Sequence, residues 1–209
     1  MKLKRIFTIG FIFAFISILL AQNAQELLQK ANEKLKRGDY NGAIKDYNDA
    51  LKENPNLSEA YQKRAKSKRM IGNLNGAIED YNSALRINAN LSNSYLGRAQ
   101  TLFKSGNFEA AIRDYNTFVS QSPNSKHLAD ILYNRGLAKM KLRDFDSALE
   151  DFNQVLKIQE NDVKALVNRG YILYQKNEIR PACTDWLKAK NLGNEKAQRN
   201  AKRACQCCM

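Results

Sequence analysis

The amino-acid sequence predicts an all-α fold, an α-solenoid of about five helix-turn-helix repeats that is closed by a short capping helix. Three observations predict it. A residue pattern recurs at a nearly constant spacing, small and apolar residues follow one another at three- and four-residue intervals, and the 209 residues include only three prolines. With 26% charged and 44% hydrophobic residues, the composition is that of a folded, helix-favouring chain.

The recurring pattern joins a turn to the beginning of a second helix. It begins at Gly38, Gly72 and Gly106, which are 34 residues apart, and again at Arg143 and Asn177 after steps of 37 and 34. A first-helix pattern precedes four of these copies, at Tyr61-Gln62-Lys63-Arg64-Ala65, Tyr95-Leu96-Gly97-Arg98-Ala99, Leu132-Tyr133-Asn134-Arg135-Gly136 and Leu166-Val167-Asn168-Arg169-Gly170. We therefore predict an array over 22–196, with units 24–57, 58–91, 92–128, 129–162 and 163–196, and a capping helix with a Cys-rich tail over 195–209.

These offsets resemble the tetratricopeptide repeat family, whose 34-residue unit carries aromatic, small, Gly and Pro residues at fixed positions. The resemblance covers residues 24 to about 196, although the last two copies lack the turn Gly and the third has an insertion near Ser125, Lys126 and His127. It implies a right-handed α-solenoid whose first helices line a concave wall that binds other proteins.

The family's groove positions fall on two kinds of residue in this chain. The first half has polar and basic groups, which could hold a carboxylate or another anion, and the second half has apolar and aromatic groups that suit recognition anchors. The alternative is that some of them only pack between helices. The predicted groove residues are Leu28, Asn32, Gln62, Lys66 and Arg69, followed by Leu96, Gln100, Phe103, Tyr133, Leu137, Met140, Tyr171 and Tyr174.

One well-known subset of the family binds the C-terminal carboxylate of cytosolic heat-shock chaperones with a set of Lys, Asn and Arg side chains. The matching positions here hold Leu28, Asn32, Lys63, Asn93 and Gly97 in one frame, and Gln62, Lys66, Gly97, Asp130 and Asn134 in the next. That carboxylate clamp is absent from the sequence.

An acid and a base recur in every repeat. Asp occupies the same position of the second helix and a basic residue the same position of the first helix, at Asp46, Asp80, Asp114, Asp151 and Asp185 and at Lys30, Arg64, Arg98, Arg135, Arg169 and Arg203. Because a catalytic pair needs one specialised environment, we interpret these as structural pairs between successive repeats, such as Asp114 with Arg135 or Asp151 with Arg169. Partly exposed pairs of this kind each contribute about 1 kcal/mol or less.

The four cysteines lie near the C-terminus, at Cys183, Cys205, Cys207 and Cys208. Cys183 occupies a core position that Ile44, Ile78, Ile112 and Leu149 hold in the other units, and Cys205 lies on the helix expected to cover it. We predict a disulfide between Cys183 and Cys205. A zinc site is the weaker alternative, because Cys-x-Cys-Cys lacks the two-residue gap that suits tetrahedral coordination.

The N-terminal segment has the order of a secretory signal peptide. Lys2, Lys4 and Arg5 precede an uncharged run over 6–20, which is followed by Ala21. We predict cleavage after Ala21, with Ala24 as the alternative site, so that residues 1–21 are removed and the protein is periplasmic or secreted. An uncleaved membrane anchor is the weaker alternative, since fifteen residues are short for a bilayer. The residues directly after the apolar run include no Cys that could be acylated as in a bacterial lipoprotein.

The expected function is non-enzymatic. The only histidine, His127, lies in the insertion, and no phosphate loop or metal-ligand motif is found, so we expect no cofactor and no metal.

We predict a scaffold, adaptor or periplasmic chaperone that binds a protein or peptide segment in its groove. The alternative is an envelope protein that binds anionic surface polymers, because 31 basic and 21 acidic residues remain after the signal segment. The basic residues are spread among acids, which disfavours nucleic acid as a partner. The oligomeric state is left open.

Overall fold

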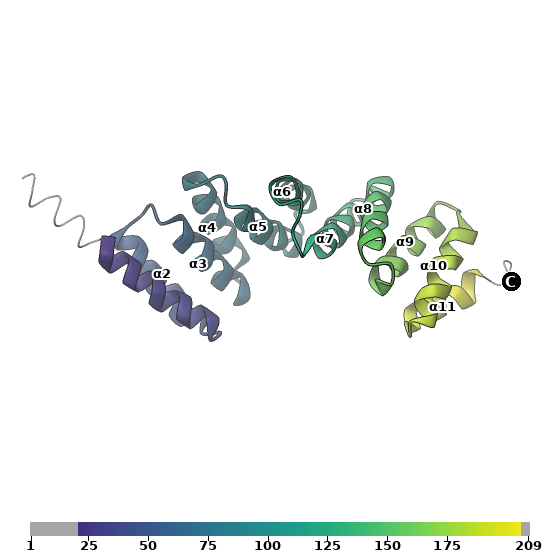
Figure 1. Ribbon diagram of the computed structural model, residues 1–209, viewed down its shortest axis with the longest axis horizontal. Helices are drawn as coiled ribbons and strands as arrows, with labels where there is room; N and C mark the ends of the chain where they lie inside the picture. The colour runs from purple at the N-terminus through teal and green to yellow at the C-terminus, as the bar shows by residue number, and fades with distance from the viewer. Residues whose placement is uncertain (1–20, 206–209) are drawn as a thin grey trace, which may run out of the picture. The chain divides into compact units, whose positions relative to one another are not determined.

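The computed structural model describes residues 21–205, which are helical apart from short connections and contain no β-strand (Figure 1). A helix over 21–36 is followed by α2 (Tyr40–Glu53), α3 (Ser58–Met70), α4 (Leu74–Ile87), α5 (Ser92–Lys104), α6 (Phe108–Gln121), α7 (Leu128–Lys141), α8 (Phe145–Ile158), α9 (Val163–Gln175), α10 (Ile179–Asn191) and α11 (Glu195–Ala204). Most of the predicted signal segment, together with Cys207 and Cys208, lies outside these described residues. Within them, no helix combines the length and the apolar character needed to cross a membrane.

The chain divides into two compact units, Met1–Gly106 and Asn107–Met209, which we call unit 1 and unit 2. In unit 1, neighbouring helices from α2 to α5 contact one another in order, and α3 also contacts α5. In unit 2, the same succession of contacts links α6 to α11. This pattern of contacts between neighbours is that of stacked helix pairs, and it agrees with the predicted all-α repeat fold.

Each repeat buries one large aromatic residue of its second helix among alanines. The equivalent positions are Tyr47, Tyr81, Tyr115, Phe152 and Trp186, all of which are nearly inaccessible to solvent. Small residues let the helices approach closely around these rings. At Gly170, for example, a Cβ atom would lie only 2.7 Å from Nε1 of Trp186. The core is therefore built in layers, one aromatic ring to a repeat.

The turn inside each repeat requires a left-handed residue followed by a helix cap. Gly38, Gly72 and Gly106 have φ between 81° and 87°, as the sequence pattern indicates. The next residue then caps the second helix, as in Asp39, whose Oδ1 accepts a hydrogen bond from the amide of Gly42 at 2.9 Å. In the last two repeats, Arg143 and Asn177 take the glycine position with φ of 62°.

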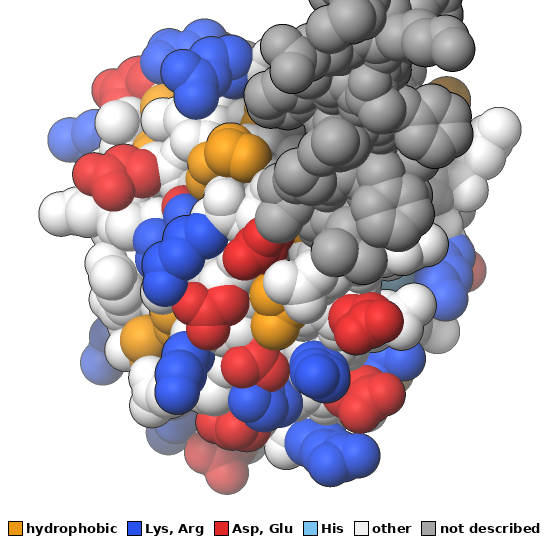
Figure 2. All heavy atoms as spheres, turned by 90° about the vertical axis from the view of Figure 1, so that its left-hand side faces the viewer, with side chains coloured by type: hydrophobic (Ala, Val, Ile, Leu, Met, Phe, Trp, Pro, Cys, Tyr) orange, Lys and Arg blue, Asp and Glu red, His pale blue; other side chains and the backbone are white. Residues whose placement is uncertain are grey.

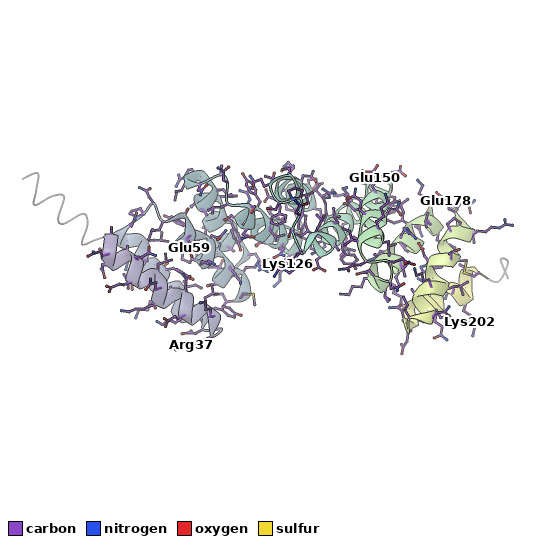
Figure 3. The ribbon with its side chains drawn as sticks, in the orientation of Figure 1. Arg37, Glu59, Lys126, Glu150, Glu178 and Lys202 are labelled. Carbon is purple, nitrogen blue, oxygen red and sulfur yellow. A yellow bond between two sulfur atoms is a disulfide. The ribbon has the colours of Figure 1, made fainter. Side chains whose placement is uncertain are left out.

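Replacing Arg143 by Gly is expected to raise the free energy of unfolding by about 0.5 to 1 kcal/mol, because the strain of a left-handed Arg exceeds the extra chain entropy of Gly. Thermal unfolding followed by circular dichroism measures this. The control is Glu150→Gly on the exposed side of α8 (Figure 3), which is expected to destabilise by about 1 kcal/mol. Destabilisation by Arg143→Gly would contradict the assignment of strain.

The recurring acid and base do pair, but the predicted partners are wrong. Arg64, Arg135 and Arg169 bind Asp80, Asp151 and Asp185 of their own repeat, at 2.6, 2.5 and 2.6 Å. Asp151 therefore pairs with Arg135 and not with Arg169. The reason is that each of these Arg residues lies on the side of the first helix that faces the second helix of the same repeat. In the first repeat, Asp46 pairs with Lys34 rather than with Lys30.

Asparagine side chains provide a recurring link between successive repeats. Nη1 of Arg64, Arg98, Arg135 and Arg169 donates to the side chain of Asn48, Asn82, Asn116 and Asn153 on the preceding helix, at 2.6 to 2.9 Å. Arg64, Arg135 and Arg169 thus each bind an Asp of their own repeat and an Asn of the repeat before it. These asparagines were not predicted from the sequence, although they recur with the same period as the arginines.

The predicted disulfide is present. Cys183 on α10 and Cys205 at the end of α11 are bonded, with their Cα atoms 5.6 Å apart. Both side chains are buried, and α11 otherwise buries only Ala197 and Ala201. The covalent bond therefore supplements a small hydrophobic contact between the capping helix and α10.

Candidate functional site

A pocket of about 220 Å³ lies in unit 1 between α3 and α5, with one residue of α4 at its floor. We call it the α3–α5 pocket. It contains five of the residues that the sequence predicted for a binding groove, namely Gln62, Lys66, Arg69, Leu96 and Gln100. Lys63, Tyr81, Asn93 and Gly97 complete the lining. No acidic residue lines the pocket.

The floor of the pocket depends on Gly97. A Cβ atom at this position would lie 2.3 Å from the hydroxyl of Tyr81, so only glycine lets the tyrosine ring reach α5. Burial raises the pKa of Tyr81, and the positive charge of Arg69 opposes the increase. Tyr81 therefore presents a neutral hydroxyl group at the floor of the pocket near pH 7.

The charges on α3 are divided between two sides of the helix. Arg64 and Lys68 both form ion pairs with Asp80 on α4. Lys63, Lys66 and Arg69 follow one another at three-residue steps and line the α3–α5 pocket. The only acid of α3, Glu59, lies at the beginning of the helix (Figure 3).

No acidic group of the described chain forms an ion pair with Lys63, Lys66 or Arg69. The Nε atom of Arg69 is buried and, within residues 21–205, has no hydrogen-bond partner. A buried donor without a partner is unusual in folded proteins. The pocket therefore combines unneutralised positive charge with a lining that contains no acid.

The other groove residues predicted in unit 1 are less available. Leu28 is only 2% exposed and packs in the core with Ala31 and Tyr47, so its assignment to a binding surface is wrong. The reason is that the first helix turns this position towards α2. Asn32 accepts a hydrogen bond from the Tyr47 hydroxyl at 2.7 Å, and Phe103 is partly buried.

In unit 2, the predicted aromatic surface is reduced to two exposed tyrosines on α9. Tyr171 and Tyr174 are 41% and 42% exposed, and the ring of Tyr174 lies 5.6 Å from that of Trp186. The other three residues pack into the molecule, as the alternative interpretation anticipated. Tyr133 packs against Phe152 and accepts a hydrogen bond from Asn168 at 3.0 Å, and Leu137 and Met140 contact the core. Burial raises the pKa of Tyr133, and the hydrogen bond from Asn168 opposes this.

Two adjoining hollows between α8 and α10 were not foreseen from the sequence. They measure about 660 and 450 Å³ and share Asn153, Arg169, Thr184 and Asp185. Their floor is the Arg169–Asp185 ion pair, and the hydrogen bonds that Arg169 donates to Asp185 raise the pKa of Arg169. In this repeat Leu173 replaces the lysine that Lys139 provides one repeat earlier, so Arg169 is 27% exposed where Arg135 is 14% exposed. The replacement of this lysine by Leu173 is the feature of the sequence from which the hollows could have been predicted.

Metal and acid–base chemistry have little basis in the described residues. Between residues 21 and 205, no three His, Cys, Asp or Glu side chains form a group that could hold a metal ion. His127 precedes α7 and is exposed, with Nδ1 3.9 Å from a carboxylate oxygen of Asp130. On the face of the molecule drawn in Figure 2, basic and acidic side chains are interspersed.

Sequence comparison identifies the class of protein that these stacked helix pairs form. Three family models, each described as a tetratricopeptide repeat, match residues 28–92, 92–125 and 129–162. Together they span more than half of the 209 residues. The fold and its helix-lined faces define an α-solenoid repeat protein. The chain belongs to the tetratricopeptide repeat family. No curated protein matches the sequence.

Solved structures share the fold at low sequence identity. One is the crystal structure of the MamA protein, whose sequence is 24% identical to this chain. The match covers 85% of this chain and 95% of the MamA chain, with a TM-score of 0.75. YrrB, described as a TPR protein with an unusual peptide-binding site, is 18% identical, with coverages of 85% and 90% and a TM-score of 0.77. The first TPR of Spaghetti, bound to the HSP90 peptide SRMEEVD, is 24% identical, with coverages of 59% and 95% and a TM-score of 0.56. These likenesses establish the tetratricopeptide solenoid fold.

Proposed function

We propose that the protein is a non-enzymatic scaffold or chaperone that binds a segment of another protein on the faces made by the first helices of its repeats. The observation that carries this proposal is the α3–α5 pocket, which gathers five predicted groove residues around unneutralised positive charge. The exposed tyrosines of α9 add an aromatic contact surface in unit 2. The peptide-binding site named for YrrB and the peptide bound to Spaghetti support binding of this kind.

We further propose that the protein acts outside the cytoplasm. The basic residues and apolar run at the N-terminus are typical of a secretory signal. The Cys183–Cys205 disulfide supports this, because such bonds persist in oxidising compartments. An exported scaffold or chaperone would meet its partners in the periplasm or outside the cell.

Replacing both exposed tyrosines, Tyr171→Ser with Tyr174→Ser, is expected to weaken peptide binding at least tenfold, because aromatic side chains supply much of the binding energy at protein interfaces. Short peptides are selected by phage display on the wild-type protein, and their affinity is then measured by calorimetry. The matched control replaces Ile158 and Leu192, which are similarly exposed but lie outside the first helices of the repeats. The control should bind as the wild type does.

The same experiment addresses the alternative of attachment to anionic polymers. Failure to select any peptide would argue against a peptide-binding scaffold. Binding that ignores the tyrosine substitutions but is lost in high salt would favour surface charge as the means of attachment, because salt screens exposed charges. On the face drawn in Figure 2, acids and bases are interspersed, so the described part of that face carries no broad surface of one sign.

A further inference from the structure

We propose that the α3–α5 pocket binds two acidic side chains from an extended internal segment of the partner protein, spaced as Asp or Glu at alternate positions. This inference rests on the proposed function, since it specifies which peptides the scaffold selects. It concerns the residues of unit 1 only. Binding of a peptide segment by the tyrosines of α9 does not require that the α3–α5 pocket bind acidic side chains.

The charges of the pocket favour carboxylates as the ligand. Lys63, Lys66 and Arg69 line the pocket, and none of them is neutralised by an acidic group of residues 21–205. Their neighbours Arg64 and Lys68 are already bound to Asp80. The buried Nε of Arg69 is a donor with no acceptor. Carboxylates would neutralise the three cations, and charge-assisted hydrogen bonds are among the stronger ones.

The spacing of the cations favours two carboxylates. Along an α-helix, residues three apart rise about 4.5 Å and residues six apart about 9 Å. Alternate side chains of an extended peptide point to the same side and lie about 7 Å apart. Two acidic side chains at alternate positions therefore fall within the length covered by Lys63, Lys66 and Arg69.

The opposite wall suits the peptide backbone. Asn93 and Gln100 on α5 carry amide groups that donate and accept hydrogen bonds, and Leu96 offers an apolar contact between them. Gln62 is already bound, because its side-chain amide donates to Ser94 at 2.8 Å. The volume of about 220 Å³ is below the size of most small-molecule sites, so side chains fit better than a nucleotide or another large cofactor.

A C-terminal carboxylate fits the pocket less well than internal acids. The residues that would form the family's carboxylate clamp are missing, and Gly97 occupies one of the matching positions with no side chain at all. The three cations lie in a row on one helix instead of converging from several helices on one point. The pocket therefore suits the side-chain carboxylates of an extended segment better than a C-terminal carboxylate.

The test measures binding of fluorescent peptides to the full chain by anisotropy. The principal probe is a Gly/Ser peptide with an internal Glu-Ser-Glu and an amidated C-terminus. Companion probes carry Gln in place of both Glu residues, or Gln at both positions with a free C-terminal carboxylate. We expect the Glu-Ser-Glu probe to bind at least tenfold more tightly than either companion.

The protein variant is Lys66→Gln with Arg69→Gln, and its matched control is Lys45→Gln with Arg86→Gln, which removes the same charge from exposed positions outside the pocket. The pocket variant should lose at least tenfold in affinity for the Glu-Ser-Glu probe, and the control less than twofold. If the double variant does not fold by circular dichroism, Lys66→Gln alone serves, because Lys66 is exposed.

Three outcomes would overturn the inference. These are equal binding of the Gln probe, preference for the free C-terminal carboxylate, or equal losses in the pocket variant and the control. None of them would undo the proposed function if the tyrosine variant still lost its selected peptides, so the two proposals fail separately.

Discussion

Replacing Asp151 by alanine is expected to lower the free energy of unfolding of unit 2 by about 3 to 5 kcal/mol, the cost of breaking a buried ion pair by removing one partner. Asp151 is 1% exposed, and its carboxylate accepts hydrogen bonds from Arg135 at 2.5 to 3.2 Å. Nζ of Lys139 lies 2.9 Å from the same carboxylate. Without Asp151, two largely buried cations would face each other with no counter-charge. Urea unfolding followed by circular dichroism measures the loss.

The control for this substitution is Asp146→Ala in the same helix. Asp146 forms an ion pair with Lys176, but its side chain is 84% exposed. Exposed pairs contribute little to stability, so the control should unfold at the wild-type urea concentration. If both substitutions had the same small effect, the buried pair would not be the source of stability in this layer.

Removing the disulfide by Cys183→Ala with Cys205→Ala is expected to destabilise the C-terminal cap by about 3 kcal/mol. The bond closes a loop with a sequence separation of 22, and the loss of chain entropy in the unfolded state scales with the logarithm of that length. The effect should be local, because α11 contacts α10 and buries few side chains of its own. Hydrogen exchange of the α11 amides measures it.

Reduction of the wild-type protein provides the matching experiment. A reductant should speed hydrogen exchange in α11 of the wild type and have no further effect on the double variant. Exchange in α2, in the other unit, should stay unchanged in both. Unaltered exchange in α11 after removal of the bond would show that the alanine contacts alone hold the cap.

Much of the fold was predictable because the repeat makes each position visible several times. The turn residues Gly38, Gly72 and Gly106 have the left-handed backbone that their pattern indicated. The disulfide was predictable for the same reason, since comparison with Ile44 and Leu149 placed Cys183 in the core. Repetition thus turned a single sequence into several observations of one structural unit.

The parts that failed depend on side-chain direction, which periodicity does not supply. Leu28 shares its repeat position with Gln62, yet the first is buried and the second lines a pocket. The Arg–Asp pairs were assigned between repeats because sequence offsets alone allow either neighbour. The floor of the α3–α5 pocket depends on a contact between Tyr81 and Gly97 that joins two repeats, and no spacing within one repeat indicates it.

The arginine that binds asparagine on the preceding helix has a consequence for how arrays of this kind change in length. Because Asn48 and Asn82 present the same acceptor to Arg64 and Arg98, excision of residues 58–91 would bring Arg98 to Asn48 and rebuild an identical joint. Because the same Arg–Asn hydrogen bond forms at each of these junctions, one repeat can follow another without loss of this contact. Gene duplication or deletion in steps of one repeat can therefore lengthen or shorten the binding surface without a new solution for the junction.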